Sequence, residues 1–313
     1  MKSWITWGRL LWALLVGLAL ATAGSFFRGS AWWLDILTDF KMQYVASAAL
    51  LFLAALASRR AKEAVLALVL LGINGVALAP HLAPAPSSRT AMKIVGFNLD
   101  MFNTAAANTL DFLHRENADV VVVYEVTVAW REALRQLSDI YPHRYYGPLQ
   151  YLPGNPPQGM GLLSKRAWEE TGVEVSDISS RTFAVWARFP AASPSLTVVG
   201  VHLSNPVYYP ASHQRSEAVA LASIVKRFDG PVVVTGDFNM TPFSARYGTL
   251  LGKTGLRRAD GGLNATWPAM LTPLGLSLDH VLIGKGIRNA TMRTGPWLGS
   301  DHLPVVGTFD LGG

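Results

Sequence analysis

Eight polar residues stand beside short apolar runs, at positions where they could share one site. Asn98 follows KIVGF, Glu125 follows DVVVVY, and His202 follows LTVVGV. The others are Asp237 and Asn239 after PVVVTG, Asp279 in SLDHVLIG, and Asp301 and His302 before LPVVGTF. Carboxylate and amide oxygens suit Mg²⁺ or Mn²⁺, and histidines can move protons or hold a phosphoryl oxygen near neutral pH. The set is therefore typical of metal-assisted phosphoester hydrolysis.

Each of these residues also has a plainer interpretation when taken alone. Asn98 and Asp237 could be turn or helix-capping residues, which is the usual role of Asn and Asp after a strand. His202 could be a hydrogen-bonded structural histidine, and we assign that role to His280, whose neighbours indicate a strand that buries alternate residues. The chemical interpretation therefore rests on the whole set and its order along the chain.

The composition excludes several other chemistries. The chain has no cysteine, so disulfides, thiolate metal sites and a cysteine nucleophile are all excluded. The sequence also lacks the HExxH motif, so it gives no indication of a protease zinc site.

Strand ends must position the polar residues. Beyond residue 91, short β-branched runs alternate with helix-like segments such as NTLDFLHREN and HQRSEAVALASIVKRF, a pattern typical of an α/β fold. Ligand sites in layered α/β proteins lie at strand ends, where the scaffold holds the loops rigidly. We expect Gly236 to give a tight turn, and Asp237 and Asn239 to point the same way from extended chain.

The first third of the chain has a different character. Residues 10–27, 42–58 and 64–80 are apolar and uncharged, and each is about long enough to cross a hydrocarbon core of ~30 Å. A cleavable leader is the competing interpretation of the first segment, because ATA at 21–23 resembles a cleavage site. Two further apolar segments favour a membrane domain over residues 1–80 with three transmembrane helices.

Basic residues predict the orientation of these helices. Arg59, Arg60 and Lys62 fill the short turn after the second span, whereas the loop at 28–41 has Arg28 and Lys41 alone. The positive-inside rule then places this turn and the N-terminus in the cytoplasm. Residues 81–91 are rich in Pro, Ser and Ala and indicate a linker, so residues 92–313 are expected on the outer side of the membrane.

The motifs GDFNMTP, SLDHVL and SDHLPV, in that order, resemble those of the endonuclease/exonuclease/phosphatase superfamily. This group contains DNase I-like nucleases, AP endonucleases, neutral sphingomyelinases and inositol-polyphosphate phosphatases. FNLD, YEVT and VVGVHLS fit its upstream motifs, and the resemblance covers about residues 92–311. It implies a four-layer α/β sandwich of two packed, mostly antiparallel sheets flanked by helices; the α/β pattern alone leaves a doubly wound parallel sheet open.

The resemblance also implies a role for each matching residue. Glu125 resembles the main Mg²⁺ ligand, with Asn98 beside it and Asp301 as a second metal contact; Mn²⁺ could replace Mg²⁺. Asp237 and Asn239 resemble the pair that orients the attacking water and the phosphate. His302 resembles the histidine that binds the phosphate or acts as base, with Asp279 as its orienting partner, and His202 resembles the histidine near the leaving group.

Two positions qualify this likeness. Nuclease and sphingomyelinase branches often carry a glutamate that pairs with the middle histidine, but here the stretch reads PPQGMGLLSK with Gln158 as the nearest polar residue. The acid role of His202 therefore stays open. Arg215 could touch substrate, although a solvated helix face is the favoured interpretation.

The layout resembles membrane-anchored bacterial members of the superfamily, including the teicoplanin-resistance type, which implies lipid-linked phosphate substrates. Residues 1–90 hold eight of the 27 Lys/Arg and three of the 21 Asp/Glu. Residues 91–313 therefore hold 19 basic and 18 acidic residues. This part is nearly neutral and lacks the basic excess of a duplex-DNA binder. The loops near the site contain Tyr208, Tyr209, Trp267 and Trp297, which could contact lipid or pack locally. We therefore expect a Mg²⁺-dependent phosphoesterase that acts on a lipid-linked phosphate, diphosphate or phosphodiester at the outer face of the bacterial inner membrane. The alternatives are an anchored nuclease that degrades extracytoplasmic nucleic acid and, less favoured, a binding module without chemistry.

Overall fold

The computed structural model describes residues 6–29, 31–81, 92–151, 154–190, 195–259 and 261–312. The chain forms two compact units: one comprises Met1–Ala83 with Thr241–Gly248, and the other comprises Pro84–Met240 with Thr249–Gly313. We call them the membrane unit and the catalytic unit. Apart from His81, the predicted linker at 81–91 lies outside the described residues.

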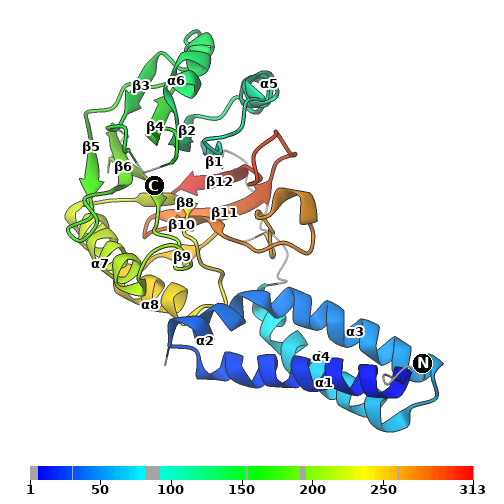
Figure 1. Ribbon diagram of the computed structural model, residues 1–313. Helices are drawn as coiled ribbons and strands as arrows, with labels where there is room; N and C mark the ends of the chain where they lie inside the picture. Colours follow the sequence, from blue (N-terminus) through cyan, green and yellow to red (C-terminus); the bar gives the residue numbers. More distant parts are fainter. Residues whose placement is uncertain are drawn as a thin grey trace. The chain divides into compact units, whose positions relative to one another are not determined.

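The membrane unit contains three long helices, α1 (Trp7–Gly24), α3 (Lys41–Ala57) and α4 (Ala61–Leu78) (Figure 1). The short helices are η1 (Ser25–Phe27), α2 (Trp32–Ile36), η2 (Leu37–Phe40) and η3 (Ala79–His81). Three stretches are long and apolar enough to cross a membrane: Trp7–Phe27, Trp32–Ala57 and Ala61–His81. The predicted loop at 28–41 is partly helical, because α2 and η2 lead directly into α3. Asp35 and Asp39 lower its hydropathy and hid this helical extension from the sequence interpretation.

The long helices pack through small and branched side chains. Leu11 and Leu15 of α1, Ala48 and Ala55 of α3, and Ala67 of α4 are fully buried in one cluster. Large apolar side chains such as Leu20, Leu50 and Val76 stay exposed on the outer faces of the helices. Small residues inside and large apolar residues outside are typical of helices that pack in lipid.

The catalytic unit contains two six-stranded sheets, with strand orders β11-β12-β1-β2-β4-β3 and β5-β6-β7-β8-β10-β9 (Figure 1). The first sheet comprises β1 (Met92–Asn98), β2 (Val120–Val126), β3 (His143–Tyr146), β4 (Gly159–Ser164), β11 (Ile287–Thr294) and β12 (Val305–Leu311). The second comprises β5 (Glu170–Val175), β6 (Thr182–Phe189), β7 (Leu196–His202), β8 (Val232–Asp237), β9 (Arg257–Arg258) and β10 (Asp279–Ile283). The β1–β2 and β7–β8 pairs are parallel and the other paired strands are antiparallel.

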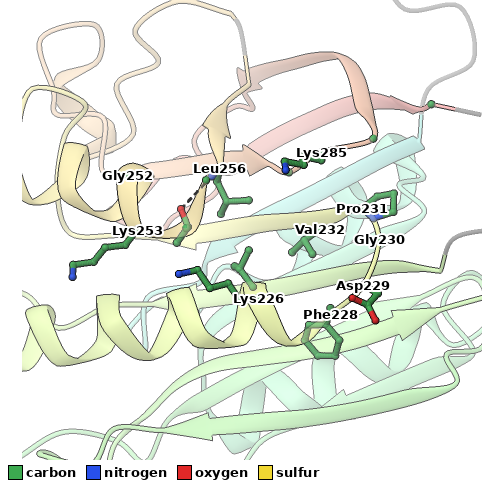
Figure 2. A pocket seen from close by; sticks show the side chains of 16 residues that line it. Lys226, Phe228, Asp229, Gly230, Pro231, Val232, Gly252, Lys253, Leu256 and Lys285 are labelled. Carbon is green, nitrogen blue, oxygen red and sulfur yellow. Dashed lines mark hydrogen bonds between the residues drawn. The ribbon is translucent and has the colours of Figure 1, made fainter.

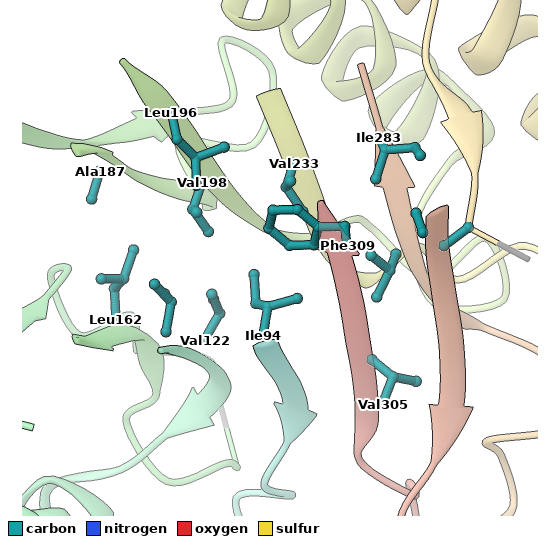
Figure 3. Packing of buried hydrophobic residues seen from close by; sticks show 14 of the residues in the cluster. Ile94, Val122, Leu162, Ala187, Leu196, Val198, Val233, Ile283, Val305 and Phe309 are labelled. Carbon is teal, nitrogen blue, oxygen red and sulfur yellow. The ribbon is translucent and has the colours of Figure 1, made fainter. Parts of the chain in front are cut away.

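Two apolar layers hold this unit together because side chains alternate between the faces of each strand. Ile94, Val122 and Val198 lie between the two sheets in one buried cluster (Figure 3). The intervening residues of β1 and β2, such as Val95, pack instead against helices α5 (Ala106–Glu116) and α6 (Val128–Leu134). The remaining helices are α7 (Ala211–Arg227) and α8 (Ala245–Thr254), with the short η4 (Arg135–Leu137) and η5 (Ala269–Leu271). The predicted sandwich of two mostly antiparallel sheets with flanking helices is confirmed.

The strand directions bring the polar residues to one end of the sandwich. β1 and β2 run parallel and end near Asn98 and Glu125, while β7 and β8 run parallel and pair His202 with Asp237. β10 runs antiparallel to β8 and pairs Asp279 with Asp237. β12 runs antiparallel to β1, so residues just before β12 also reach this end. We call it the site end, and the opposite end of β8 and β10 the far end.

Candidate active site

An amide and two carboxylates meet at the centre of the site end. Asn98 Nδ2 lies 3.1 Å from Glu125 Oε1 and 3.3 Å from Asp237 Oδ2, so one amide group donates toward both acids. Asn98 and Asp237 are almost fully buried. The backbone N–H of Met101 also donates to Glu125 Oε2 at 3.1 Å, which fixes that carboxylate from its other side.

The second part of the site is a histidine held between carboxylates. His302 Nδ1 lies 2.8 Å from Asp279 Oδ2, and His302 Nε2 lies 3.7 Å from Asp237 Oδ2. Ser300 fixes the approach of this segment, because its hydroxyl donates to Asn98 O at 2.7 Å and accepts from the His302 N–H at 3.0 Å. The predicted Asp279–His302 pair is therefore present as a short contact.

His202 lies close to the same acids. Its Nε2 atom is 3.8 Å from Glu125 Oε1 and 3.7 Å from Asp237 Oδ2. Gln158 pairs through its backbone with Gln150, and the described hydrogen bonds include none between its side chain and His202. Among the described residues, the acids that lie within 4 Å of His202 are therefore Glu125 and Asp237.

Backbone conformation aims two of these side chains. Glu125 has φ of 56° and lies where the β2–β4 register shifts between Val123 and Val126. Such irregularities re-aim side chains near functional sites. Asn239 also has a left-handed backbone, with φ of 49°, a conformation that asparagine tolerates better than most residues. A non-glycine residue in this region is strained, and strain of this kind concentrates at functional sites.

The expectation of an extended Asp237–Asn239 pair is wrong. β8 ends at Asp237, and the chain then turns so that the Asn239 N–H donates to Asp237 Oδ1 at 2.9 Å. The Asn239 side chain donates to Leu203 O at 2.9 Å. Gly236 lies within β8 and forms no turn; a Cβ there would meet Val201 O at 2.0 Å. The glycine is needed for close approach of two strands.

Burial and charge crowding shift the acidity of the central groups. Burial raises the pKa of Asp237 to about 7, partly opposed by His302 and reinforced by Asp279. Burial also raises the pKa of Glu125. Burial by itself would lower the pKa of His302, but Asp279 and Asp237 outweigh it and raise the pKa to about 10. Burial, followed by the nearby charges of Arg181 and His302, lowers the pKa of His202 well below its usual value. At neutral pH the two histidines therefore differ, with His302 cationic and His202 neutral.

The donor set fits a hard divalent cation. Asp237, Asp279 and His302 each place one possible ligand atom within 4.8 Å of the others. Among the described residues, Asp279 Oδ1 is a buried carboxylate oxygen without a hydrogen-bond partner. Asp237 belongs both to this group and to the Asn98–Glu125 cluster. Buried carboxylates that lie close together are stabilised by a cation, and Mg²⁺ prefers oxygen ligands.

Two predicted residues lie toward the edge of the cluster. Asp301 is exposed, and its Oδ2 accepts a 2.9 Å hydrogen bond from the Trp267 indole, although its charge still acts on Glu125 and His302. Arg215 is exposed on α7, as expected for a solvated helix face. His280 is buried and its Nε2 contacts Met240 O at 3.0 Å, in agreement with its structural assignment.

The sequence interpretation missed a buried polar layer behind His202. The Glu217 carboxylate accepts from the Ser204 N–H and hydroxyl, both at 2.7 Å. Arg181 NH1 lies 3.3 Å from Ser204 Oγ and 3.8 Å from Glu217 Oε1. Gln214 donates to Ser204 O and Asn239 O, which ties the two site loops together. Gln214 and Glu217 lie three residues apart on α7, so their shared buried face could have been a signal.

Apolar side chains are exposed on the loops that surround these residues. Each lies on a segment that leaves or enters a strand at the site end. We call this set the apolar rim: Phe102, Val128, Val207, Tyr208, Met270, Leu271, Leu274 and Trp297. It contains eight of the twelve exposed large apolar residues described in the catalytic unit. A concentration of this kind marks an apolar contact surface.

A cavity of about 660 Å³ lies at the far end. It is lined by glycine-rich loops and by Lys226, Lys253 and Lys285 (Figure 2), all three of which are exposed. None of the predicted site residues lines it. Its cations are solvated, and its carboxylate, Asp229, is also exposed. The hollow therefore lacks a buried cluster of ionisable groups like the one at the site end.

The fold and the site define a class of phosphoester-cleaving proteins. Residues 95–302 match the model of the Endonuclease/Exonuclease/phosphatase family, and the chain belongs to that family. Its members are metal-dependent phosphoesterases or nucleases, so this chain is a metal-dependent phosphoric ester hydrolase. A search of curated protein sequences gives no match.

Several solved structures share the fold. TDP2 from D. rerio, complexed with single strand DNA product, is 16% identical with a TM-score of 0.56, over 71% of this chain and 100% of that chain. Sphingomyelinase C from Streptomyces griseocarneus is 17% identical with a TM-score of 0.55, over 70% and 99%. A mutant of beta toxin from Staphylococcus aureus with bound magnesium ions is 16% identical with a TM-score of 0.55, over 70% and 99%. At these identities the likeness concerns the fold.

Proposed function

We propose that this protein is a Mg²⁺-dependent phosphoesterase that hydrolyses a lipid-linked phosphate, diphosphate or phosphodiester at the outer face of the bacterial inner membrane. The observation that carries the proposal is the apolar rim around a charged, phosphate-competent site. A soluble nucleotide or nucleic acid would favour polar and basic loops, whereas a lipid substrate presents apolar chains beside its phosphate.

The membrane unit supports the same proposal. An enzyme with three candidate spans meets lipid substrates in two dimensions and does not need to recruit them from solution. The positive turn at Arg59, Arg60 and Lys62 favours a cytoplasmic location for that turn. Three crossings would then place the catalytic unit outside the cytoplasm.

The proposed ligands of Mg²⁺ are Glu125, Asn98 and Asp237, with Asp301 as a second contact. Mn²⁺ could bind the same oxygens. When bound, the ion would neutralise charge on the phosphoryl oxygens. The oxygen of Asp279 that lacks a partner gives the site additional negative charge to balance such a cation.

Asp237 would also take part in the chemistry, together with residues that are not proposed as metal ligands. Asp237 and Asn239 would orient the attacking water and the phosphate. Cationic His302, held by Asp279 at 2.8 Å, would bind a phosphoryl oxygen as negative charge develops there. Neutral His202 would lie beside the leaving group, where its ring would form a hydrogen bond to the leaving oxygen.

The test compares substrates on the full-length protein in detergent with Mg²⁺. A polyprenyl pyrophosphate, sphingomyelin and plasmid DNA are incubated separately, with Asp237→Ala as the inactive control. We expect hydrolysis of a lipid substrate, loss of that activity in Asp237→Ala, and little cleavage of the plasmid. Full activity in Asp237→Ala would refute the proposed site.

A rim variant sharpens the substrate assignment. Tyr208 is 81% exposed, so Tyr208→Ser should raise KM for a lipid in vesicles by about three- to tenfold through lost apolar contact. Val219→Ser, at a half-exposed position on α7, is the matched control and should leave KM unchanged. An equal effect of both variants would show that the apolar rim does not contact the lipid substrate specifically.

An anchored nuclease is the alternative, supported by the shared fold of TDP2 with its single strand DNA product. A nuclease that binds phosphates along a strand loses affinity steeply as salt rises. Plasmid cleavage with a steep salt dependence, together with no lipid hydrolysis, would therefore favour this alternative.

A further inference from the structure

We propose that Asp35 and Asp39 of the membrane unit are positioning residues for the metal site, because they fix the chain segment that continues directly from it. This inference rests on the proposed function for its kinetic test, but not for its binding test. The segment is Thr241–Gly248, which belongs to the membrane unit although both of its chain neighbours belong to the catalytic unit. We call it the anchored segment.

Asp39 holds the start of the anchored segment. Its Oδ1 atom accepts from the Thr241 hydroxyl at 2.5 Å and from the Thr241 N–H at 3.2 Å. Asp39 is 7% exposed and Thr241 is 1% exposed. A buried carboxylate that accepts two hydrogen bonds is strongly restrained, since losing either partner leaves an unsatisfied polar group.

Asp35 holds the next part of the segment. Its carboxylate accepts from the Ser244 hydroxyl at 2.8 Å, from the Ala245 N–H at 2.8 Å and from Arg246 Nε at 2.5 Å. Ser244 Oγ in turn accepts from the Arg246 N–H at 3.1 Å. The first turn of α8 is therefore capped by its own serine and by an aspartate about 210 residues earlier in the chain, and a negative charge at this position is stabilising.

Two further contacts complete the attachment. Arg28 NH1 donates to Phe243 O at 3.0 Å, and the rings of His81 and Phe243 meet edge to face with centroids 5.1 Å apart. Residues from the ends of the apolar helices thus bind five positions of one short segment, 241 and 243–246. A loop with a merely connecting role does not require two buried carboxylates as partners.

The attachment bears on the metal site through chain continuity. Asn239 lies two residues before Thr241, and its N–H donates to Asp237 Oδ1 at 2.9 Å. Asn239 holds a left-handed backbone at φ of 49°, a conformation that persists where its surroundings enforce it. Gln214 and His280 restrain the chain before Thr241 through Asn239 O and Met240 O. Asp39 restrains the chain on the C-terminal side of Asn239, through its two hydrogen bonds from Thr241.

The same geometry explains why the sequence continues GDFN with MTPFS. Thr241 supplies two donors to one carboxylate oxygen, Pro242 fixes the backbone, and Ser244 caps α8. The membrane unit therefore does more than tether the enzyme. Its acidic pair sets the backbone from which Asp237 is oriented.

The test uses the full-length protein in lipid nanodiscs and four variants. Asp39→Ala removes the acceptor, whereas Asp39→Asn keeps an oxygen at the same position and is the conservative rescue. Glu63→Ala is the matched control, because Glu63 is a buried carboxylate of the same unit that pairs with Arg60 at 2.6 Å and makes no described contact with the anchored segment. Hydrogen exchange, Mn²⁺ affinity measured by electron paramagnetic resonance, and kcat and KM are determined for each protein.

In Asp39→Ala we expect faster exchange confined to the segment around 238–246, Mn²⁺ affinity weakened roughly tenfold, and kcat lowered roughly tenfold with KM nearly unchanged. Asp39→Asn and Glu63→Ala should stay within about twofold of the wild type. Thr241→Val, which removes one of the two donors, should fall between them.

Faster exchange in Asp39→Ala with unchanged Mn²⁺ affinity would overturn the inference, because the contact would then be purely structural. Equal losses in Glu63→Ala would overturn it as well, since they would indicate general damage to the membrane unit. If the wild type hydrolyses none of the tested substrates, the proposed function fails, while Mn²⁺ affinity still decides the role of Asp39.

Discussion

The two ends of the catalytic sandwich share the same strands but differ in how they treat charge. At the site end, Asp237, Asp279 and His302 are buried within a few ångströms of one another. At the far end, Lys226, Lys253 and Lys285 line a cavity and remain in solvent (Figure 2). Buried charges perturb one another strongly, whereas solvated charges hardly interact. The contrast teaches that burial and crowding of ionisable groups, rather than the presence of a cavity, distinguish the proposed site from the opposite end of the same sheets.

The largest expected effect separates the two ends directly. His302→Ala removes the cation that Asp279 and Asp237 hold, so turnover should fall by about 10²- to 10⁴-fold. Lys285→Ala at the far end should leave turnover within about twofold, as expected for a solvated surface residue. Steady-state hydrolysis of the lipid substrate measures both. A comparable loss in Lys285→Ala would assign chemistry to the far-end cavity and break the comparison.

Replacing a glycine should also cost more stability at the site end than at the far end. Gly236 lies against β7, where a Cβ would meet Val201 O at 2.0 Å, so Gly236→Ala should destabilise the protein by about 3 kcal/mol through overpacking. Gly255 at the far end has φ of 69° with open space around it, so Gly255→Ala should cost about 1 kcal/mol through backbone strain alone.

Chemical unfolding of the full-length proteins, followed by tryptophan fluorescence, gives both values. Hydrolysis of the lipid substrate should fail in Gly236→Ala even at temperatures where the variant remains folded, since β7 carries His202 and β8 carries Asp237. Equal destabilisation of the two variants would show that close packing is not special to the site end.

The sequence predicted much of this arrangement for identifiable physical reasons. Alternating β-branched runs specify strands, and polar residues at their ends cannot be buried without partners, so Asn98, Glu125, Asp237 and His302 indicated one site. The α/β pattern left the sheet topology open, and the motif resemblance supplied the antiparallel sandwich. Three uncharged segments predicted the membrane helices, since length and hydropathy are local properties.

What the sequence could not give depends on long-range contacts or on backbone conformation. The turn at Asn239 replaced the expected extended pair, because a positive φ leaves no periodic pattern in the sequence. Asp35 and Asp39 lie in the segment that was expected to be a loop, and their partners lie more than 200 residues away in the anchored segment. Arg181 and Glu217 form an ion pair at 3.8 Å behind His202, and no spacing along the chain connects them.

The smallest expected effect is the pH dependence that the buried groups of the site end give to stability and metal binding. Burial raises the pKa of Asp237 from 3.8 to about 7, so without metal the folded state binds a proton that the unfolded state has already lost above pH 4. This contribution to stability is fully present below pH 3.8 and is lost as pH rises through about 7. His302, with its pKa raised from 6.5 to about 10, adds a contribution that is lost between those values.

A divalent cation competes with the proton on Asp237. Stabilisation by the metal should therefore increase as pH rises, opposite to the trend of the metal-free protein. Mg²⁺ affinity should be about tenfold weaker at pH 6 than at pH 8, because the Asp237 carboxyl is mostly protonated at the lower pH. The Mg²⁺-induced rise in Tm should therefore be larger at pH 8, and Lys285→Ala should show the same dependence as the wild type. Calorimetric titration at the two pH values measures the affinity. An affinity that is independent of pH between 6 and 8 would mean that Asp237 is ionised throughout, and the crowding that distinguishes the site end would be weaker than its geometry implies.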